Sequence, residues 1–499
     1  MLLHFWTFAC INCQHALQSL ATIERELEGE PLLIISVHSP KFPAQREVEL
    51  ATEAVRQLEV THPVVLDPDS RITHSFAVSG WPTMVFVGPA GTILGTLRGE
   101  PEPQGLLNVV RQVLAAGKAD GSLTGGPLPL KPDRAPPHRL AFPEAVLCAE
   151  VAGEPRVIVA DSGHHQVVIC DTAGAELLRI GTGAPGLADG PAAEAELRRP
   201  CGLAVVHQPE GDILYIADTG NHALRAVDLQ ANLVTTLAGG PGQSTAPPLR
   251  SPWGLAWSGS RLYLAAAGSH QLWAFDPATS HLAVIAGTGA EGGKDGPATE
   301  AYFAQPSGLA FSGGPVGHSG HGGHGGHRAL YVVDAETSSI RAIDGLDDPG
   351  RARLGGAGTR TVCGAGDLFG FGDRDGAGPG AELQHPIGLT GGPDGTLWVA
   401  DTFNHKIKRV DPSTGSCRTA FGNGDSLLDE ASPAGTVLGP AGPDRPLFCV
   451  PEGVAAGPDG RSLLVADTGN HRIVSVPLDQ GGGPATVLIG GPAGQRDRR

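Results

Sequence analysis

A short motif that recurs six times constrains the fold of this 499-residue chain more than any other feature. Most copies combine an apolar run, an aspartate and a turn that ends in histidine, and they alternate with a Pro-x-Gly element. Successive copies are roughly 50–70 residues apart, a period typical of a β-propeller with several short strands per unit. The sequence therefore predicts six blades. The copies are VADSGHHQV (159–167), IADTGNHAL (216–224), AAAGSHQLW (265–273), VVDAETSSI (332–340), VADTFNHKI (399–407) and VADTGNHRI (465–473).

The motif, which can be written ADTGNHxIR, resembles the NHL repeat. The resemblance implies that each aspartate ends a strand and accepts N–H groups of the following turn, while each histidine braces neighbouring strands. A ring of metal ligands is the alternative for the histidines, but scaffold symmetry explains why they recur once per blade. These positions are Asp161, Asp218, Asp334, Asp401 and Asp467, then His165, His222, His270, His405 and His471, with Ala266 and Ser338 as replacements.

The first 116 residues have a different pattern, in which strand-like runs alternate with helical ones. LLHFW, PLLIISVHS and MVFV are typical of buried strands, whereas the apolar residues after Cys13 and those between positions 43 and 59 have helical spacing. This alternation predicts an α/β sandwich around a mixed sheet. We therefore expect a domain at 1–116, a Gly- and Pro-rich linker at 117–141, the propeller at 142–492 and a tail at 493–499.

Two cysteines, Cys10 and Cys13, lie where the first predicted strand passes into a helix. Backbone N–H groups at a helix N-terminus stabilise an anion, which favours a thiolate at Cys10, and Cys13 follows one turn later. A zinc site would need a second pair of ligands, and the sequence contains no second Cys-x-x-Cys. A redox dithiol is therefore favoured over a metal knuckle or a pair of structural thiols, and neither a metal nor a cofactor is predicted.

Four segments of this region resemble the thioredoxin-like superfamily in its TlpA and redoxin branch: FWTFACINC, ISVHSPKFP, THPVVLDPDS and SGWPT. The resemblance implies a thioredoxin-like fold in which Cys10 is the attacking thiolate and Cys13 the resolving thiol. It also implies that Pro82 is cis, faces the dithiol and pairs with the backbone of an incoming peptide. The alternative for Pro82 is an ordinary turn proline at the start of a strand.

Three residues depart from the pattern of that superfamily. Ala9 stands where many members carry Trp, and Trp81 precedes Pro82 where small or β-branched residues are usual, which would narrow what can dock. His4 stands six residues before Cys10, where many members carry a buried Asp. A neutral imidazole at this place could pass a proton to Cys13, but a buried histidine with a purely structural role is the favoured interpretation.

Charge and cysteine content limit the partners and the compartment. Lys+Arg 35 against Asp+Glu 52 give a net charge of −17, which disfavours binding to nucleic acid. No apolar run approaches the roughly 20 residues of a membrane helix. The eight cysteines are sparse, which indicates free thiols in a reducing compartment and a cytoplasmic location. Because the chain begins inside a core-like strand, we expect its N-terminus to be truncated. An exported form of the protein is therefore the alternative to a cytoplasmic location.

The order of motifs along the whole chain resembles the NHL-repeat-containing protein 2 family. The segments that carry this resemblance are ACINC, VHSPKFP, FAQPSGL, FGFGDRDG, LQHPIGL and DTFNHKIKRVDP. It implies a thioredoxin-like domain fused to a six-bladed NHL propeller. We therefore expect a thiol–disulfide oxidoreductase that acts on a protein disulfide or thiol and binds a protein partner on a propeller face. The alternative is a non-catalytic interaction scaffold whose dithiol is vestigial or regulatory.

A His-rich tract, GHSGHGGHGGHR at residues 317–328, interrupts the fourth repeat. Flexible tracts of this kind can hold divalent metal ions weakly. An exposed loop insertion between two strands is the simpler interpretation, so no metal site is assigned to it.

Overall fold

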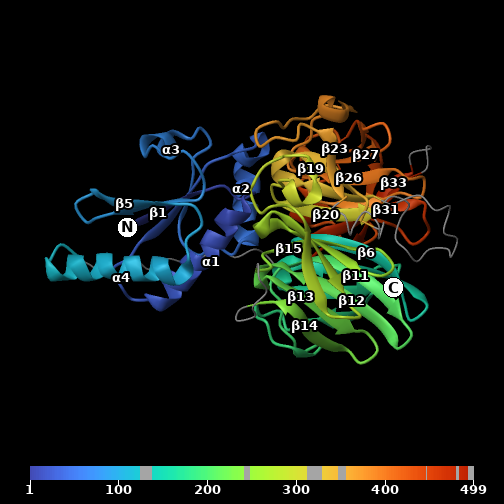
Figure 1. Ribbon diagram of the computed structural model, residues 1–499, viewed down its shortest axis with the longest axis horizontal. Helices are drawn as coiled ribbons and strands as arrows, with labels where there is room; N and C mark the ends of the chain where they lie inside the picture. Colours follow the sequence, from blue (N-terminus) through green and yellow to red (C-terminus); the bar gives the residue numbers. More distant parts are fainter. Residues whose placement is uncertain are drawn as a thin grey trace. The chain divides into compact units, whose positions relative to one another are not determined.

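The structure, a computed structural model, describes residues 1–123, 137–240, 248–311, 329–346, 356–445, 447–478 and 483–492. The chain divides into two compact units, Met1–Pro136 and Pro137–Arg499, and each is described by itself (Figure 1). The His-rich tract at 317–328 and the expected tail at 493–499 lie outside the described residues. The second unit begins within the stretch expected to be linker, because His138 and Arg139 pair with Pro492 and Gly491.

The N-terminal unit is an α/β domain built on one five-stranded sheet of order β3-β2-β1-β4-β5. The central strand β1 runs parallel to β2 and antiparallel to β4, so the sheet is mixed, as predicted. The elements are β1 (Leu2–Trp6), α1 (Ile11–Glu26), β2 (Ile34–His38), η1 (Pro43–Arg46), α2 (Val48–Gln57), β3 (Val64–Leu66), α3 (Arg71–Ser75), β4 (Thr83–Val87), β5 (Ile93–Arg98) and α4 (Pro103–Ala119).

Strand β1 is buried on both faces, which explains why LLHFW has no polar–apolar alternation. Leu2 and Trp6 point to one face, where they pack in a cluster with residues of α1 and α4. Leu3 and Phe5 point to the other face, where they pack near Ile72 of α3. Because side chains alternate along a strand, His4 lies on the same face as Leu2 and Trp6.

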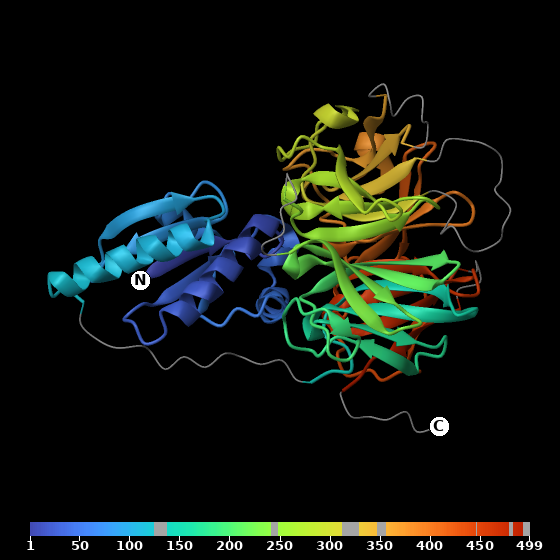
Figure 2. The same ribbon diagram turned by 60° about the horizontal axis from the view of Figure 1, so that its bottom comes forward.

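The second unit is the predicted six-bladed β-propeller (Figure 2). Blade 1 holds β6 (Pro143–Val151), β7 (Glu154–Asp161), β8 (Gln166–Cys170) and β9 (Glu176–Ile180). Blade 2 holds β10 (Gly190–Pro191), β11 (Pro200–Gln208), β12 (Gly211–Asp218), β13 (Ala223–Asp228) and β14 (Leu233–Gly239), and blade 3 holds β15 (Pro252–Trp257), β16 (Leu262–Ala266), β17 (Gln271–Asp276) and β18 (His281–Ala286).

The remaining blades follow the same order. Blade 4 holds β19 (Gly296–Pro297), β20 (Pro306–Phe311), β21 (Leu330–Asp334), β22 (Ser339–Asp344) and β23 (Gly358–Gly364). Blade 5 holds β24 (Gly376–Ala377), β25 (Leu389–Gly391), β26 (Leu397–Asp401), β27 (Lys406–Asp411) and β28 (Ser416–Phe421), and blade 6 holds β29 (Val437–Pro440), β30 (Pro451–Ala456), β31 (Ser462–Asp467), β32 (Arg472–Pro477) and β33 (Pro484–Ile489).

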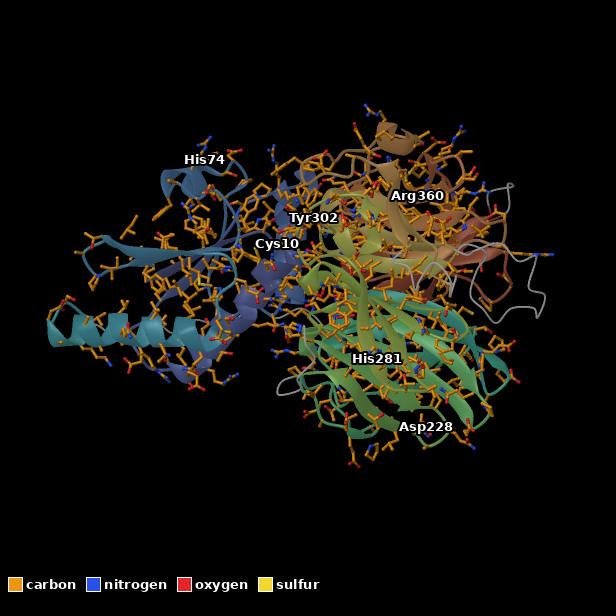
Figure 3. All side chains as sticks on the ribbon, in the orientation of Figure 1. Cys10, His74, Asp228, His281, Tyr302 and Arg360 are labelled. Carbon is orange, nitrogen blue, oxygen red and sulfur yellow. The ribbon has the colours of Figure 1, made fainter. Side chains whose placement is uncertain are left out.

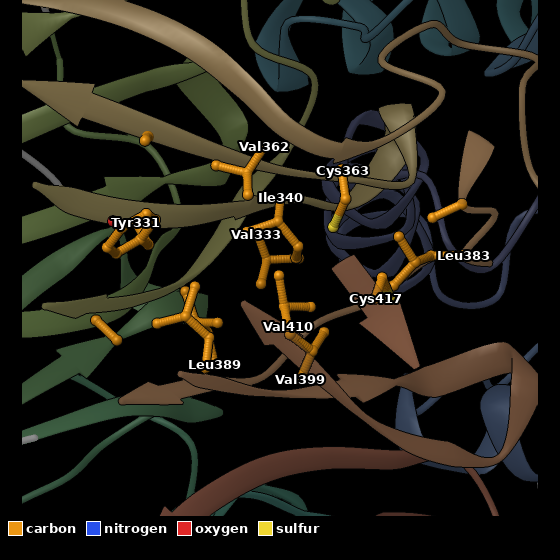
Figure 4. Packing of buried hydrophobic residues seen from close by; sticks show 14 of the residues in the cluster. Tyr331, Val333, Ile340, Val362, Cys363, Leu383, Leu389, Val399, Val410 and Cys417 are labelled. Carbon is orange, nitrogen blue, oxygen red and sulfur yellow. The ribbon is translucent and has the colours of Figure 1, made fainter. Parts of the chain in front are cut away.

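Apolar side chains fill the space between adjacent blades. Figure 4 shows one such cluster, in which Ile340 and Cys363 of blade 4 pack with Val410 and Cys417 of blade 5. Each blade is a continuous segment of chain, so the ring closes by contact between β30 and β6 rather than by a shared strand. The propeller is therefore a repeated sandwich in which every sheet buries both of its faces against its neighbours.

The glycine of the Pro-x-Gly element lets the innermost strands of adjacent blades approach closely. A Cβ added at Gly388 would lie 1.9 Å from the carbonyl oxygen of Glu452, and one at Gly202 would lie 1.9 Å from that of Trp253. The same clash, at 2.2 and 2.5 Å, occurs for Gly254 and Gly308. Only glycine fits here, because the clashing atoms belong to the backbone of the next blade and cannot rotate away.

We expect Gly388→Ala to destabilise the propeller by about 1–3 kcal/mol, since the added methyl group must push two strands apart. Gly380→Ala is the matched control, because a Cβ at Gly380 meets no atom within 4 Å. The measurement is the midpoint of denaturant-induced unfolding of the full chain, monitored by near-UV circular dichroism. Equal midpoints for the two variants would show that the close approach at Gly388 does not limit stability.

Candidate functional site

Cys10 caps the N-terminus of α1. Its backbone is extended, and its Sγ accepts the N–H of Cys13 at 3.4 Å. Cys10 is partly exposed whereas Cys13 is fully buried, and both are free thiols. Figure 3 shows Cys10 at the start of α1. The cap geometry places the Cys10 sulfur beside the unsatisfied amides at the N-terminal end of the helix.

Trp81 and Pro82 lie directly before β4, the antiparallel neighbour of β1. Thr83 pairs with Phe5, so Pro82 is next to the end of β1 from which the chain leads to Cys10. The Trp81–Pro82 peptide bond is cis. The Trp81 side chain is partly buried and packs against the apolar clusters on both faces of the sheet.

His4 is fully buried in the centre of β1. Burial, with a smaller contribution from His62, lowers the pKa of His4 to about 3, so the imidazole is neutral near pH 7. Its Nδ1 lies 3.0 Å from Ser36 Oγ, which in turn lies 2.7 Å from His62 Nε2. His62 Nδ1 lies 3.2 Å from Glu24 Oε1. Sequence reasoning identified His4 but missed its partners, because these residues have no local spacing in common.

The repeated aspartates of the propeller accept a backbone N–H, but not that of the following turn. In each case Oδ1 accepts the N–H of a residue just before the innermost strand of the same blade, at 2.6–2.8 Å. The expected N–H groups of the turn reach the aspartates through side chains instead: Oδ2 of Asp218, Asp401 and Asp467 accepts from Nδ2 of the turn residues Asn221, Asn404 and Asn470, each at 2.8 Å. Each aspartate thus joins the end of the second strand of its blade to the start of the innermost strand by a hydrogen bond. The donors are Ala141, Arg198, Ala304, Gln384 and Cys449.

The repeated histidines link each blade to the next one. Their Nδ1 accepts the backbone N–H of a residue with positive φ that precedes the innermost strand of the neighbouring blade. In blade 4 the Oγ of Ser338 does the same, and His471 joins blade 6 to blade 1. The predicted bracing role is confirmed by the pairs His165–Arg199 (3.3 Å), His222–Ser251 (3.0 Å), His270–Gln305 (3.1 Å), Ser338–His385 (3.2 Å), His405–Val450 (3.0 Å) and His471–Phe142 (3.0 Å).

Within the described residues, one group of three side chains has the spacing of metal ligands: His138, Glu430 and His471. The bond from the Phe142 N–H to His471 Nδ1 places the proton of this imidazole on Nε2. His471 then has no lone pair left for a metal ion. The group does not fit a three-ligand metal site while the inter-blade hydrogen bond is intact.

In every blade but blade 4, the residue after the proline of the Pro-x-Gly element, or of Pro-Glu-Ala in blade 1, lines a central cavity of about 190 Å³. At this position blade 1 has Glu144, whose buried carboxylate accepts from Arg199 at 3.0 Å and from Cys201 at 2.6 Å. Burial raises the pKa of Cys201 well above its usual value, with Glu144 adding to the effect. Cys201 is therefore a protonated thiol that contributes to a buried polar cluster.

Comparison with known proteins covers both units. A family model described as the NHL repeat matches residues 448–474. The NHL repeat-containing protein 2 of Bos taurus is 34% identical over 513 residues, which is 96% of this chain and 66% of that protein. Protein SUPPRESSOR OF QUENCHING 1, chloroplastic, of Arabidopsis thaliana is 33% identical over 502 residues, or 96% of this chain and 44% of that protein. Thioredoxin-like protein SkfH of Bacillus subtilis is 24% identical over 100 residues, or 20% of this chain and 69% of that protein.

The fold and the repeats define an NHL-repeat β-propeller protein with an N-terminal α/β domain. The matches to the curated relatives extend through both units. The chain belongs to the NHL repeat-containing protein 2 family, as the order of its motifs predicted. It spans 66% of the length of those relatives. Among the helices in the described ranges, none is both long and apolar enough to cross a bilayer.

One of the inter-blade histidines, His405, gives the propeller a defined pH dependence. Burial lowers the pKa of His405 to about 4 from the ordinary 6.5, against a smaller opposing effect of Asp425. Between these two values the unfolded chain binds the proton and the folded chain does not, so protons favour unfolding. The stabilisation by neutral His405 is complete above pH 6.5 and declines as the pH falls towards 4, by at most about 3 kcal/mol.

We therefore expect wild type to lose stability relative to His405→Ser as the pH falls from 6.5 to 4. Serine keeps an acceptor, as Ser338 does in blade 4, but does not titrate in this range. The measurement is the denaturation midpoint of both proteins at several pH values. A constant difference between the two proteins would show that His405 is not held neutral in the folded state.

Proposed function

We propose that the N-terminal unit is a thioredoxin-like thiol–disulfide oxidoreductase in which Cys10 is the nucleophile and Cys13 the resolving thiol. The observation that carries this proposal is the geometry of the pair. Cys10 caps α1 and is partly exposed, and its Sγ lies 3.4 Å from the backbone nitrogen of the buried Cys13. An accessible sulfur at a helix N-terminus with a second thiol one turn away has the arrangement required for dithiol exchange.

Two further observations support a thioredoxin-like domain. The sheet order, with a central strand that leads directly into the helix bearing both cysteines, agrees with such a fold. A curated relative that matches 100 residues of the chain is itself described as a thioredoxin-like protein. Pro82 lies beside the strand that leads to Cys10, so it and Trp81 are the proposed docking surface for the substrate backbone.

The proposed reaction proceeds by two exchanges. The Cys10 thiolate attacks one sulfur of a partner disulfide, a bond forms between the two sulfurs, and the other partner sulfur leaves as a thiolate. Cys13, deprotonated, then attacks Cys10 Sγ, and the bond between Cys10 and the partner breaks with the electron pair on the partner sulfur. The partner disulfide is thereby reduced to two thiols, and the Cys10–Cys13 dithiol is oxidised to a disulfide.

The propeller is proposed as the module that binds a protein partner and presents it to the dithiol. A rigid ring with six loop sets offers a broad surface for this purpose, and the acidic net charge favours a partner that is not a nucleic acid. The eight free thiols of the chain agree with a reducing compartment such as the cytoplasm.

We expect the full chain to accelerate reduction of insulin disulfides by dithiothreitol, and Cys10→Ser or Cys13→Ser to abolish this acceleration. Because Cys13 resolves the intermediate, pre-reduced Cys13→Ser protein mixed with insulin in the absence of dithiothreitol should accumulate a Cys10–insulin adduct visible by non-reducing electrophoresis and mass spectrometry. Cys170→Ser is the matched control, since burial raises the pKa of Cys170 to about 12 and holds it as an inert thiol. Absence of both acceleration and adduct would leave the interaction scaffold as the function of the chain.

A further inference from the structure

The central cavity of the propeller carries charge of one sign. It measures about 190 Å³, and its lining comes from the innermost strands of all six blades. Most of the lining side chains are apolar, but two are glutamates, Glu144 of blade 1 and Glu452 of blade 6. No lysine, arginine or histidine is among the described residues that line it. The charged part of the cavity wall is therefore acidic.

The two glutamates come from neighbouring blades. Each follows the proline at the start of its innermost strand, and those strands, β6 and β30, are in contact where the ring closes. Glu144 is 3% exposed and Glu452 is 8% exposed. Buried carboxylates of this kind are costly unless positive charge compensates them. The two together need about two positive charges.

Arg199 supplies one of these charges. Its Nη2 donates to Glu144 Oε1 at 3.0 Å. Burial opposes the charge of Arg199, but Glu144 and, with a smaller effect, Glu452 raise its pKa, so the guanidinium is charged. Cys201, which donates its S–H to Glu144, is a protonated thiol and adds no charge. The group therefore holds one negative charge more than Arg199 neutralises.

An aromatic side chain lines the opposite side of the cavity. Trp253 occupies in blade 3 the position that Glu452 occupies in blade 6, and blades 3 and 6 lie across the ring from each other. Trp253 is 6% exposed, and Trp257 of the same strand also lines the cavity. The face of an indole ring attracts cations, so the carboxylates and the tryptophans favour the same kind of guest.

Size and ligand chemistry narrow the guest to an organic cation. An engineered apolar cavity of about 150 Å³ in another protein holds benzene, so this one has space for a molecule of about seven non-hydrogen atoms. A metal ion is disfavoured, because the one group of three closely spaced ligands among the described residues is His138, Glu430 and His471, outside the cavity. The aliphatic part of the wall suits the carbon atoms of an organic cation.

We propose that the central cavity of the propeller is a binding site for a small alkylammonium ion. Its positive nitrogen lies between the glutamate pair and Trp253, and its carbon substituents contact the aliphatic side chains of the innermost strands. The site lies within the propeller, so this inference goes beyond the oxidoreductase function proposed for the other unit and does not depend on it.

The test uses the full chain with choline and butylammonium as probes, a quaternary and a primary alkylammonium ion of suitable size. Dimethylbutanol is the matched uncharged probe, since carbon replaces the quaternary nitrogen of choline. Isothermal titration calorimetry gives the affinity and the stoichiometry, and tryptophan fluorescence reports on the cavity wall. Sodium chloride keeps the ionic strength constant, because the chain has a net charge of −17 and attracts cations over its whole surface.

Glu452→Gln removes one charge from the cavity with little change of shape and leaves the pair between Glu144 and Arg199 intact. Its matched control is Glu336→Gln, because Glu336 is a buried glutamate of the propeller, 5% exposed, that does not line the cavity. Circular dichroism checks that each variant is folded.

Trp253→Leu removes the aromatic face but keeps an apolar side chain. Its matched control is Trp398→Leu, because Trp398 belongs to the propeller but stacks on Phe421 and does not line the cavity. This second pair of variants keeps the test decisive if Glu452→Gln does not fold, and the comparison of charged and uncharged probes needs no variant at all.

We expect at least one alkylammonium probe to bind wild type with a stoichiometry of about one and to change the tryptophan emission, and dimethylbutanol to bind more weakly than choline. Glu452→Gln should weaken binding on the order of tenfold or more, since a buried charge partner is lost. Trp253→Leu should weaken it about threefold or more and remove most of the emission change. The two control variants should match wild type.

Three results would overturn the proposal. The first is that neither probe binds above the sodium chloride background. The second is that dimethylbutanol binds as tightly as choline, which would indicate a purely apolar cavity. The third is that Glu452→Gln and Trp253→Leu bind the probes as wild type does, or that the control variants lose as much affinity as they do, which would place the bound cation on the general acidic surface.

Discussion

The propeller depends on one hydrogen bond made six times, from a backbone N–H at the entry of each blade to a side chain of the preceding blade. The donor residue has φ between 45° and 62° in every case, a conformation that costs about 1–3 kcal/mol in a residue other than glycine. Its N–H would be buried without a partner if the acceptor were absent, at a further cost of about 1–3 kcal/mol. The acceptor is therefore required, but its identity is not, which explains why Ser338 can stand where five blades carry histidine.

A second rule governs the buried charges of the blades. Asp218 forms an ion pair with Arg225, seven residues later in the sequence. With the same sequence spacing, Asp334 pairs with Arg341 and Asp401 with Lys408. Blade 3 has Ala266 in place of the aspartate, and Trp273 stands where the cation would be. Both charges are absent together, because a buried cation without its carboxylate would be far more costly than an apolar pair.

The N-terminal domain uses buried polar groups differently. In the propeller each polar contact holds two backbone segments together, and its partners lie at repeated positions. In the α/β domain, hydrogen bonds join the side chains of His4, Ser36, His62 and Glu24, which come from four segments far apart in the sequence.

The sequence alone determined the six blades, the α/β character of the first domain and the placement of Cys10 and Cys13 one turn apart at the start of a helix, because these features follow from local periodicity and short spacings. It also identified the bracing histidines, since a position repeated once per blade has the same environment each time. Only the tertiary structure decided which backbone groups the repeated aspartates and histidines hold, because their donors lie in another strand or another blade. It alone joined Ser36, His62 and Glu24 to His4, since hydrogen bonds between segments far apart in sequence depend on strand register and helix packing, which leave no pattern in the order of residues.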